Sequence, residues 1–298
     1  MNTDKDYIRN YYQTVKKYKD SMNLQVIEQG INVMVDFVRN YDSAPNELLN
    51  FRDKSNILRE ETYKYDIFDK AHEALNLGTW NIDSVGSGMI CHRVADAMAY
   101  TGNLVNRHYL VPEFLNLLKT TDKRKRDKYE LALYNIYLGD DEKKAFIDAT
   151  NNDCFKAKYP LIAFLFFIKD RNRFLPTSPD TFDAIFSEMG LPFKMSKRCS
   201  WDNYCEFLAI ISCVQDYLSR SGLCEHEVSL LDAHSAVWIM NYAAYKSWRD
   251  TTNDINTPMR PKNRIRKPDG NTYYVCARCS KTFIQNQRCP ECGQLVKQ

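Results

Sequence analysis

The sequence predicts a mainly α-helical protein, with a multi-helix body and a small β module at its C-terminal end. Two observations carry this prediction. Apolar residues recur every three or four positions through much of the first 250 residues, and four of the ten cysteines lie within seventeen residues near the C-terminal end. Hydrophobic residues make up 44% of the 298 residues, enough to bury a large core and to exclude wholesale disorder. The low counts of glycine and proline, 10 each, argue against a collagen-like or turn-dense all-β chain.

Residues 1–250 are expected to form one helical domain. The segment 24–41 places its apolar side chains on one face of a helix, and 8–18 shows the same period. Residues 42–70 are highly charged and have a weaker period. The three glycines within 78–88 indicate an irregular loop at which the domain can be subdivided. The helical period then resumes at 89–99, 112–119, 129–138 and 142–149.

Start and stop signals place the later helices. A Ser or Asp at the N-cap and a Gly just past the last turn are typical helix boundaries. The apolar run 160–169 fits either a buried helix or a strand, and Pro160 at its start favours the helix. The boundary signals predict helices between Ser178 and Gly190, between Ser200 and Gly222, and over 233–248 with Asp232 as its cap.

The basic charge is concentrated at the C-terminal end. Residues 251–298 hold nine Lys/Arg and three Asp/Glu, a net charge of +6. The other 32 basic and 35 acidic residues leave residues 1–250 at −3. Residues 251–270 contain three prolines and five basic residues without an apolar period, so they are expected to form a basic linker. This uneven charge predicts an anionic partner for the C-terminal end.

Four cysteines have the spacing of a metal site. Cys276, Cys279, Cys289 and Cys292 form two Cys-x2-Cys pairs separated by nine residues, which suits tetrahedral coordination of a structural Zn²⁺ by four thiolates. Pro290 and Gly293 favour a tight turn at the second pair, and strands are expected at 273–275 and 282–284. The remaining six cysteines are expected to be buried as small apolar side chains. They are Cys91, Cys154, Cys199, Cys205, Cys213 and Cys224.

On these residues, 271–298 resembles a zinc ribbon, in which two cysteine pairs are bridged by a short β-hairpin. The resemblance implies a structural zinc and a small platform for nucleic acid or protein. Iron is an alternative metal, and a disulfide pairing is the alternative without a metal. Three roles stay open for the module: nucleic-acid binding, docking to a protein, and a passive appendage.

Basic and aromatic residues in and beside the module are candidate nucleic-acid contacts. Cationic side chains in a flexible strap and on a compact platform suit phosphate binding. Tyr273, Tyr274 and Phe283 can stack on bases if they are exposed, or else form the core of the module. The expected phosphate contacts are Arg264, Arg266, Lys267, Arg278 and Lys281.

Three features of the body suggest chemistry as well as structure. His226, Asp232 and His234 form a dense polar cluster that could hold a hydrolytic metal, although helix capping explains Asp232 without one. The glycine turn 86–88 precedes a helix and could bind an anion, but a plain turn is favoured because no P-loop pattern follows. Five basic residues within 121–129 could contact phosphate, but a solvated turn between helices is favoured.

Segments of the second half loosely resemble uncharacterised bacterial proteins that accompany restriction and phage-defence genes. The segments are 174–190, the Ser-Trp-Asp-Asn-Tyr helix start at 200–204, and Asp-Ala-His-Ser at 232–235. The resemblance implies a place in a prokaryotic antiviral defence or mobile-element system. A tail of the HNH nuclease kind would need histidines, and residues 251–298 contain none.

Together these observations predict a non-catalytic, nucleic-acid-associated or complex-forming protein, in which a helical body carries a zinc-ribbon platform. The alternative is a nuclease or other hydrolase of a defence system, with its site around His226–His234. No apolar run approaches the roughly 18 residues of a membrane helix, and residues 1–20 lack the apolar core of a secretory signal. We therefore expect a cytoplasmic protein without a membrane partner.

Overall fold

The computed structural model describes most of the chain and divides it into two compact units. The units comprise residues 1–241 and 242–298, and each is described by itself. Side chains are described in these ranges except at 6–10, 40–41, 241–251 and 263–266. The described residues are 6–41, 48–52, 58, 61–195, 199–251, 263–266, 270–276, 282–284, 288–290 and 296.

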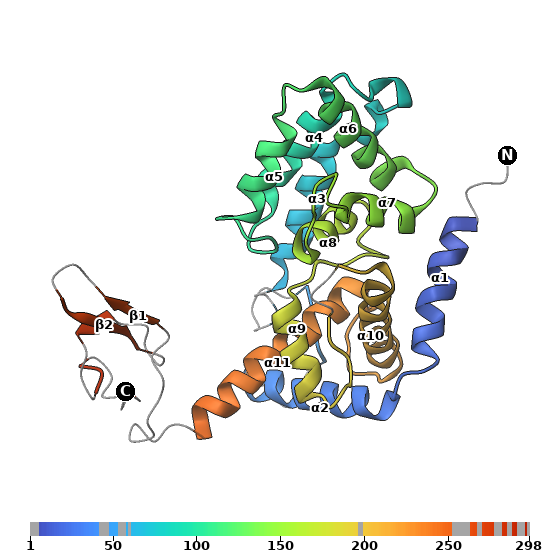
Figure 1. The fold of residues 1–298 in the computed structure, drawn as a ribbon. Helices are drawn as coiled ribbons and strands as arrows, with labels where there is room; N and C mark the ends of the chain where they lie inside the picture. The colour runs from blue at the N-terminus through green and yellow to red at the C-terminus, as the bar shows by residue number, and fades with distance from the viewer. Residues whose placement is uncertain are drawn as a thin grey trace. The chain divides into compact units, whose positions relative to one another are not determined.

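The described residues of the first unit are mainly helical, which confirms the prediction of a mainly α-helical protein (Figure 1). In Figure 1 the helices α3 to α8 lie together, and α1, α2, α9 and α10 pack beside them with the start of α11. The helices are α1 (Asp6–Lys19), α2 (Leu24–Tyr41), α3 (Tyr63–Leu75), α4 (Met89–Ala97), α5 (Leu110–Leu118), α6 (Lys123–Leu138), α7 (Glu142–Thr150), α8 (Tyr159–Phe167), α9 (Pro179–Glu188), α10 (Trp201–Arg220) and α11 (Leu230–Thr251).

Helix α8 forms the centre of the core. Its run from Leu161 to Phe167 is buried on all sides, and Pro160 lies in its first turn. This confirms the helical interpretation of the apolar run. Aromatic rings from other segments pack against it: the ring of Phe166 lies 5.0 Å from that of Phe174 and 5.9 Å from that of Trp201, centroid to centroid. The body is therefore held by extensive apolar burial, the dominant favourable contribution to folding.

Several helix boundaries agree with the sequence, and others do not. The side-chain oxygen of Ser200 accepts a hydrogen bond from the backbone nitrogen of Asn203, as a cap should. The prediction that Asp232 caps the last helix is wrong, because α11 begins at Leu230. Ser229 precedes it and forms a reciprocal pair with Asp232: each side chain accepts from the other residue's backbone nitrogen, at 2.9 and 3.1 Å.

The basic run within 121–129 is also helical rather than a turn between helices. Helix α6 begins at Lys123, six residues earlier than the predicted segment 129–138. The carboxylate of Asp122 accepts hydrogen bonds from the backbone nitrogens of Arg124 and Lys125. This cap starts the helix within the charged run, where the apolar period had given no signal.

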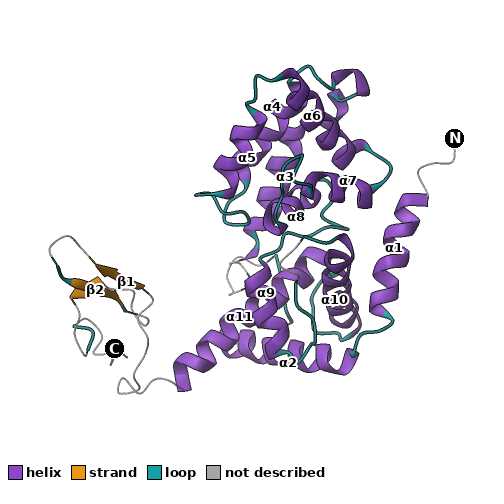
Figure 2. Cartoon of the chain, viewed as in Figure 1, coloured by secondary structure: helices purple, strands orange, loops and turns teal. Residues whose placement is uncertain are grey.

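The second unit contains a three-stranded antiparallel sheet with the order β1-β2-β3 (Figure 2). Its strands are β1 (Asn263–Arg266), β2 (Thr272–Val275) and β3 (Thr282–Ile284). Strand β1 falls within the segment 251–270 that was expected to be a linker, so the sheet begins before the predicted module. The rest of that segment lies outside the described residues, apart from residues 251 and 270. Gly270, with φ of +82°, lies in the connection between β1 and β2.

Across the helices that the structure describes, none is both long and apolar enough to cross a membrane.

Candidate metal centre and nucleic-acid interface

Two of the four clustered cysteines lie in one small core of the second unit. Cys276 follows β2 directly, and Cys289 precedes the turn at Pro290. Their exposed fractions are 0% and 1%. They share a buried cluster with Tyr274, Phe283 and Val296. Cys279 and Cys292 lie outside the described residues. The structure thus brings together one cysteine from each Cys-x2-Cys pair.

The chemistry of this cluster fits a metal-stabilised module. Both described thiols lie among apolar side chains, which would exclude water from a metal–sulfur centre. Among the described residues the cluster has five members, and a unit of this size is too small to be stable by apolar burial alone. Among the described residues no group of three or more metal-binding side chains occurs, since half of the candidate ligand set falls outside them. The residues present are compatible with a tetrahedral thiolate site.

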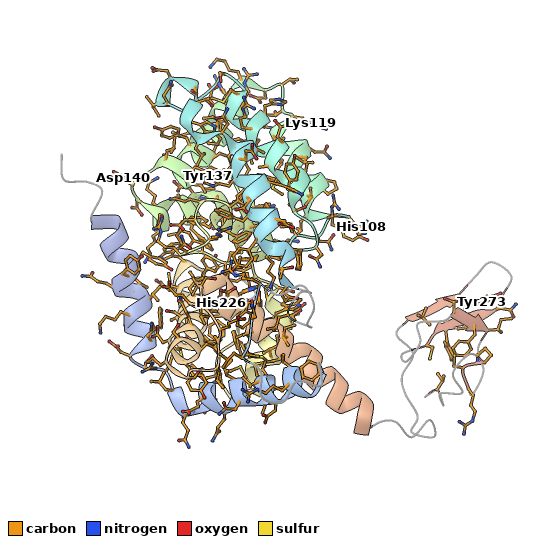
Figure 3. The ribbon with its side chains drawn as sticks, turned by 180° about the vertical axis from the view of Figure 1, so that it is seen from behind. His108, Lys119, Tyr137, Asp140, His226 and Tyr273 are labelled. Carbon is orange, nitrogen blue, oxygen red and sulfur yellow. The ribbon has the colours of Figure 1, made fainter. Side chains whose placement is uncertain are left out.

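The sheet has two different faces. Tyr274 pairs with Phe283 across β2 and β3, and both side chains are buried on the cysteine side, with ring centroids 6.1 Å apart. The neighbouring pair, Tyr273 and Ile284, belongs to the opposite face because side chains alternate along a strand. Ile284 is 55% exposed, and Tyr273 is half-buried (Figure 3). Of the three aromatic residues proposed to stack on bases, only Tyr273 lies on the outer face.

The structure places the backbone of two predicted phosphate contacts on the edge strand. Arg264 pairs with Tyr274 and Arg266 with Thr272, so both residues belong to β1 rather than to a linker. Their side chains lie outside the described set, as do Lys267, Arg278 and Lys281 entirely.

The candidate hydrolytic residues of the body do not converge. Nε2 of His226 is 3.9 Å from Oδ2 of Asp232, whose carboxylate also binds Arg52 and Tyr65 at 3.1 and 2.6 Å. His234 faces elsewhere, because both of its ring nitrogens already have other partners within 3.0 Å. The three side chains therefore form no common metal site in the described structure.

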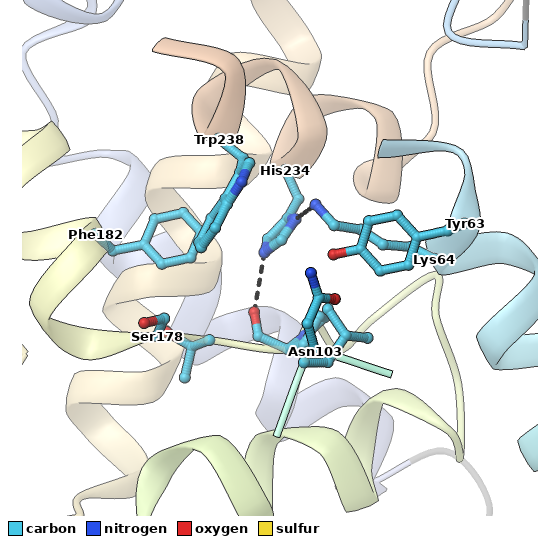
Figure 4. Close-up of a pocket in the computed structure, with 10 residues that line it drawn as sticks. Tyr63, Lys64, Asn103, Ser178, Phe182, His234 and Trp238 are labelled. Carbon is cyan, nitrogen blue, oxygen red and sulfur yellow. Dashed lines mark hydrogen bonds between the residues drawn. The ribbon is translucent and has the colours of Figure 1, made fainter. Parts of the chain in front are cut away.

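His234 instead belongs to a buried polar cluster that the sequence did not reveal (Figure 4). Its Nδ1 lies 3.0 Å from Nζ of Lys64, and its Nε2 lies 2.9 Å from the carbonyl oxygen of Pro176. Lys64 also pairs with the carboxylate of Glu61, and only 1% of the lysine side chain is exposed. Burial and the nearby Lys64 charge lower the pKa of His234 well below its ordinary value, while burial lowers the pKa of Lys64.

The lowered pKa of His234 favours its neutral form near neutral pH. A neutral His234 accepts from the Lys64 ammonium through Nδ1 and donates through Nε2 to Pro176. The adjoining cavity has a volume of about 40 Å³, room for a few water molecules and far less than a substrate pocket. The cluster is therefore a structural ion pair with an oriented histidine. The charged segment 42–70 offered no period that would have marked Lys64 as buried.

The glycine turn at 86–88 does bind an anion, and the anion is part of the chain. One carboxylate oxygen of Glu130 accepts hydrogen bonds from the backbone nitrogens of Gly86 and Gly88, at 2.7 and 3.0 Å. The other accepts from that of Cys91, at 2.9 Å. Gly86 and Gly88 have φ near +90°, a conformation that L side chains rarely adopt. This turn is therefore filled by Glu130 and presents no vacant anion site.

The two units thus differ in how their functional candidates are arranged. In the body, the candidate histidine and the glycine turn are both occupied by internal partners. In the second unit, one cysteine of each pair converges beneath a sheet whose other face is partly open. No protein-family model matches this sequence, and neither a curated protein nor a solved structure shows significant similarity to it.

Proposed function

We propose that this protein binds nucleic acid through a zinc-stabilised ribbon carried by a helical body. The observation that carries the proposal is the shared burial of Cys276 and Cys289 on one face of a sheet whose other face holds Tyr273 and Ile284. A platform with a closed metal side and a partly open side suits a binding module rather than a catalytic centre.

In this proposal Cys276, Cys279, Cys289 and Cys292 hold one structural Zn²⁺. A closed site of four thiolates leaves no open position for substrate, so the ion supplies folding energy and not catalysis. Iron, the other metal that such a site accepts, would give a coloured protein and is an outcome of the metal analysis.

The basic residues and the outer face supply the proposed contacts to nucleic acid. The net charge of +6 over residues 251–298 attracts a polyanion. Arg264, Arg266, Lys267, Arg278 and Lys281 are the proposed phosphate contacts. Stacking of a base on Tyr273 would add affinity that tolerates any sequence. Membership of a prokaryotic defence or mobile-element system is also proposed, and it is supported only by the resemblance of 174–190, 200–204 and 232–235.

The first test is metal content. Purified full-length protein is expected to contain one zinc per chain by elemental analysis, with the four clustered thiols protected from alkylation until a chelator is added. Protein that lacks stoichiometric zinc or iron and has all four thiols freely reactive would contradict the metal site.

The second test is binding to labelled single- and double-stranded oligonucleotides across a range of salt concentrations. Affinity is expected to fall steeply with salt, and the variant R264A/R266A/K267A to reduce the log–log slope by about 2 to 3, close to one per lost phosphate contact. The control K143A/K144A removes two exposed lysines of α7 that pair with Asp202 and Asp148. A slope that is flat for the unaltered protein contradicts nucleic-acid binding and leaves protein docking as the role of the module.

The alternative of a nuclease or other hydrolase at His226–His234 gains no support from the described arrangement. It would need a different set of ligands, because His234 is committed to Lys64 and Pro176.

A further inference from the structure

We infer that the helical body has a second surface for nucleic acid, formed by the basic first turns of α6. This inference shares its partner with the proposed function but rests on different residues, in a different unit. We call this surface the α6 basic patch. Its members are Lys119, Lys123, Arg124, Lys125, Arg126 and Lys128.

The patch is an island of positive charge on an acidic body. Residues 119–128 hold six basic and two acidic residues, a net charge of +4. The remainder of residues 1–250 holds 26 basic and 33 acidic residues, a net charge of −7. A polyanion is repelled by the body as a whole, so this patch is where it would be drawn in.

Internal partners neutralise little of the patch. Lys123 pairs with Asp127 at 2.7 Å, and Asp122 is used as the helix cap. Glu130, one turn further along α6, points inward to the glycine turn. Within the described chain Lys119, Arg124, Lys125 and Lys128 are exposed and form no ion pair. Four cations are therefore available to a partner, three of them on α6.

The patch also works against the stability of its own helix. The N-terminal end of a helix carries a partial positive charge, so cations in its first turn are unfavourable by about 0.3–1 kcal/mol each. Helix α6 places four cations in succession there. Sequences that break such a local rule tend to do so at functional sites. A bound phosphate would remove this repulsion.

One arginine beside the exposed cations is incompletely satisfied. Nε of Arg126 is buried and has no hydrogen-bond partner in the described structure, and the same holds for Nε of Arg93 on α4. Arg126 lies against the turn at Gly88, since a Cβ built there would be 3.7 Å from its Cδ. Helices α4 and α6 pack side by side (Figure 1).

The underlying scaffold is rigid. Tyr129, Leu133 and Ile136 on the inner face of α6 are buried in the core. The patch therefore keeps its geometry without a ligand, which limits the entropy lost on binding. Unpaired cations on a helical surface suit the regularly spaced phosphates of a nucleic-acid backbone. Because every member of the patch is a Lys or an Arg, we expect contacts to phosphates rather than stacking on bases.

The experiment compares R124A/K125A/K128A with the unaltered full-length protein, using the same oligonucleotides and salt series. We expect affinity at low salt to fall about tenfold or more and the log–log slope to decrease by about 2 to 3. K143A/K144A, which removes exposed but paired lysines from the same unit, should leave both unchanged. Thermal unfolding should be unaffected or slightly improved in the α6 variant, because unfavourable charges are removed.

The outcomes separate this inference from the proposed function. If R124A/K125A/K128A binds like the unaltered protein while R264A/R266A/K267A binds weakly, the inference is overturned and the ribbon proposal stands. If only the α6 variant binds weakly, the body is the nucleic-acid surface and the ribbon proposal fails. Both proteins are also tested for binding to anionic vesicles and to an acidic polypeptide. If R124A/K125A/K128A loses binding to either of these but keeps oligonucleotide binding, the patch belongs to another partner and the inference is overturned.

Discussion

The body and the C-terminal module achieve order by different means. The body buries whole helices, such as α8, among aromatic rings from several segments. Among its described residues the module buries a cluster of five side chains, two of which are cysteines. Apolar burial alone can hold the first but not the second. If the proposed metal is bound, the clustered cysteines of the small unit supply stability that the body draws from many buried apolar residues.

The cysteines of the two regions differ in the same way. In the body, burial raises the pKa of Cys91 to about 12 and that of Cys213 to about 11, so these thiols stay protonated and behave as small apolar side chains. Cys91, Cys154, Cys205 and Cys213 are buried, and Cys199 and Cys224 are half-buried. Cysteine thus packs as a small apolar side chain in the body and is the proposed metal ligand in the module.

Loss of the proposed metal should have the largest effect and should be confined to the module. Zinc binding to small ribbon-like domains is worth roughly 10–16 kcal/mol, so C276S or a chelator is expected to unfold the module completely. Proteolysis and amide hydrogen exchange should report loss of β2 and β3 while the helical signal of the body persists. C213A, a cavity-forming change in the body, should leave zinc content unchanged.

One experimental outcome would contradict this prediction. If C276S retains protection of the backbone amides in β2 with no metal bound, then the five-residue core suffices, and the contrast between the two regions is not one of metal against apolar burial.

A large-to-small change in the body should have the next largest effect. Phe166 is fully buried against Phe174 and Trp201, so F166A removes a large apolar side chain and leaves a cavity. We expect it to lower the free energy of unfolding by about 3–5 kcal/mol. Urea unfolding followed by circular dichroism measures this loss. Zinc content should not change, and a drop in zinc content would show that the two units are energetically coupled.

The carboxylate of Glu130 tests a polar element of the body. E130Q keeps the size of the side chain but turns an NH₂ group toward backbone donors at the glycine turn. We expect a loss of about 1.5–3 kcal/mol in unfolding free energy, since charge-assisted hydrogen bonds are removed and donors are left unpaired. E113Q, at an exposed position in the first turn of α5, is the matched control. Equal stability of the two variants would mean that the turn does not depend on the carboxylate.

The sequence predicts the elements of this fold better than their long-range partners. The helix starting near Pro160 and the cap at Ser200 follow from local signals, and the structure agrees with both. The prediction that Asp232 caps the last helix fails because Ser229, three residues earlier, precedes the helix and pairs reciprocally with Asp232. Strand β1 contains one apolar residue, Ile265, so its alternation becomes visible only beside β2.

The candidate sites show the same division. The spacing of the cysteines identifies the possible metal ligands, because that chemistry depends on local turns. The pairing of Lys64 with His234 spans 170 residues, and that of Glu130 with Gly86 spans 44. No local pattern encodes such pairs, so the sequence offered a hydrolytic metal site at His234 only as an alternative and favoured a plain turn at Gly86, where the structure has an ion-paired cluster and a turn filled by a carboxylate.

The smallest expected effect is a pH dependence confined to the body. The pKa of His234 is lowered in the folded state, so between that value and the ordinary pKa near 6.5 the unfolded chain binds more protons. The contribution of neutral His234 to the free energy of unfolding is therefore fully present above about pH 6.5. It is lost as the pH falls below that value, by up to about 1.4 kcal/mol per pH unit. Lys64 and Phe182 lie against the ring, and the Lys64 ammonium, which also pairs with Glu61, makes protonation of the ring costlier still.

H234Q isolates this contribution from that of other titrating groups. Urea unfolding of both proteins at several values between about pH 5 and pH 7.5 should show the advantage of the unaltered protein shrinking as the pH falls. The thiols of the proposed metal site also take up protons at low pH, so unfolding of the body is followed by tryptophan fluorescence, because Trp80 and Trp201 are buried there. A difference between the two proteins that stays constant over this range would mean that His234 is protonated alike in the folded and unfolded states, and that the buried cluster does not hold it neutral.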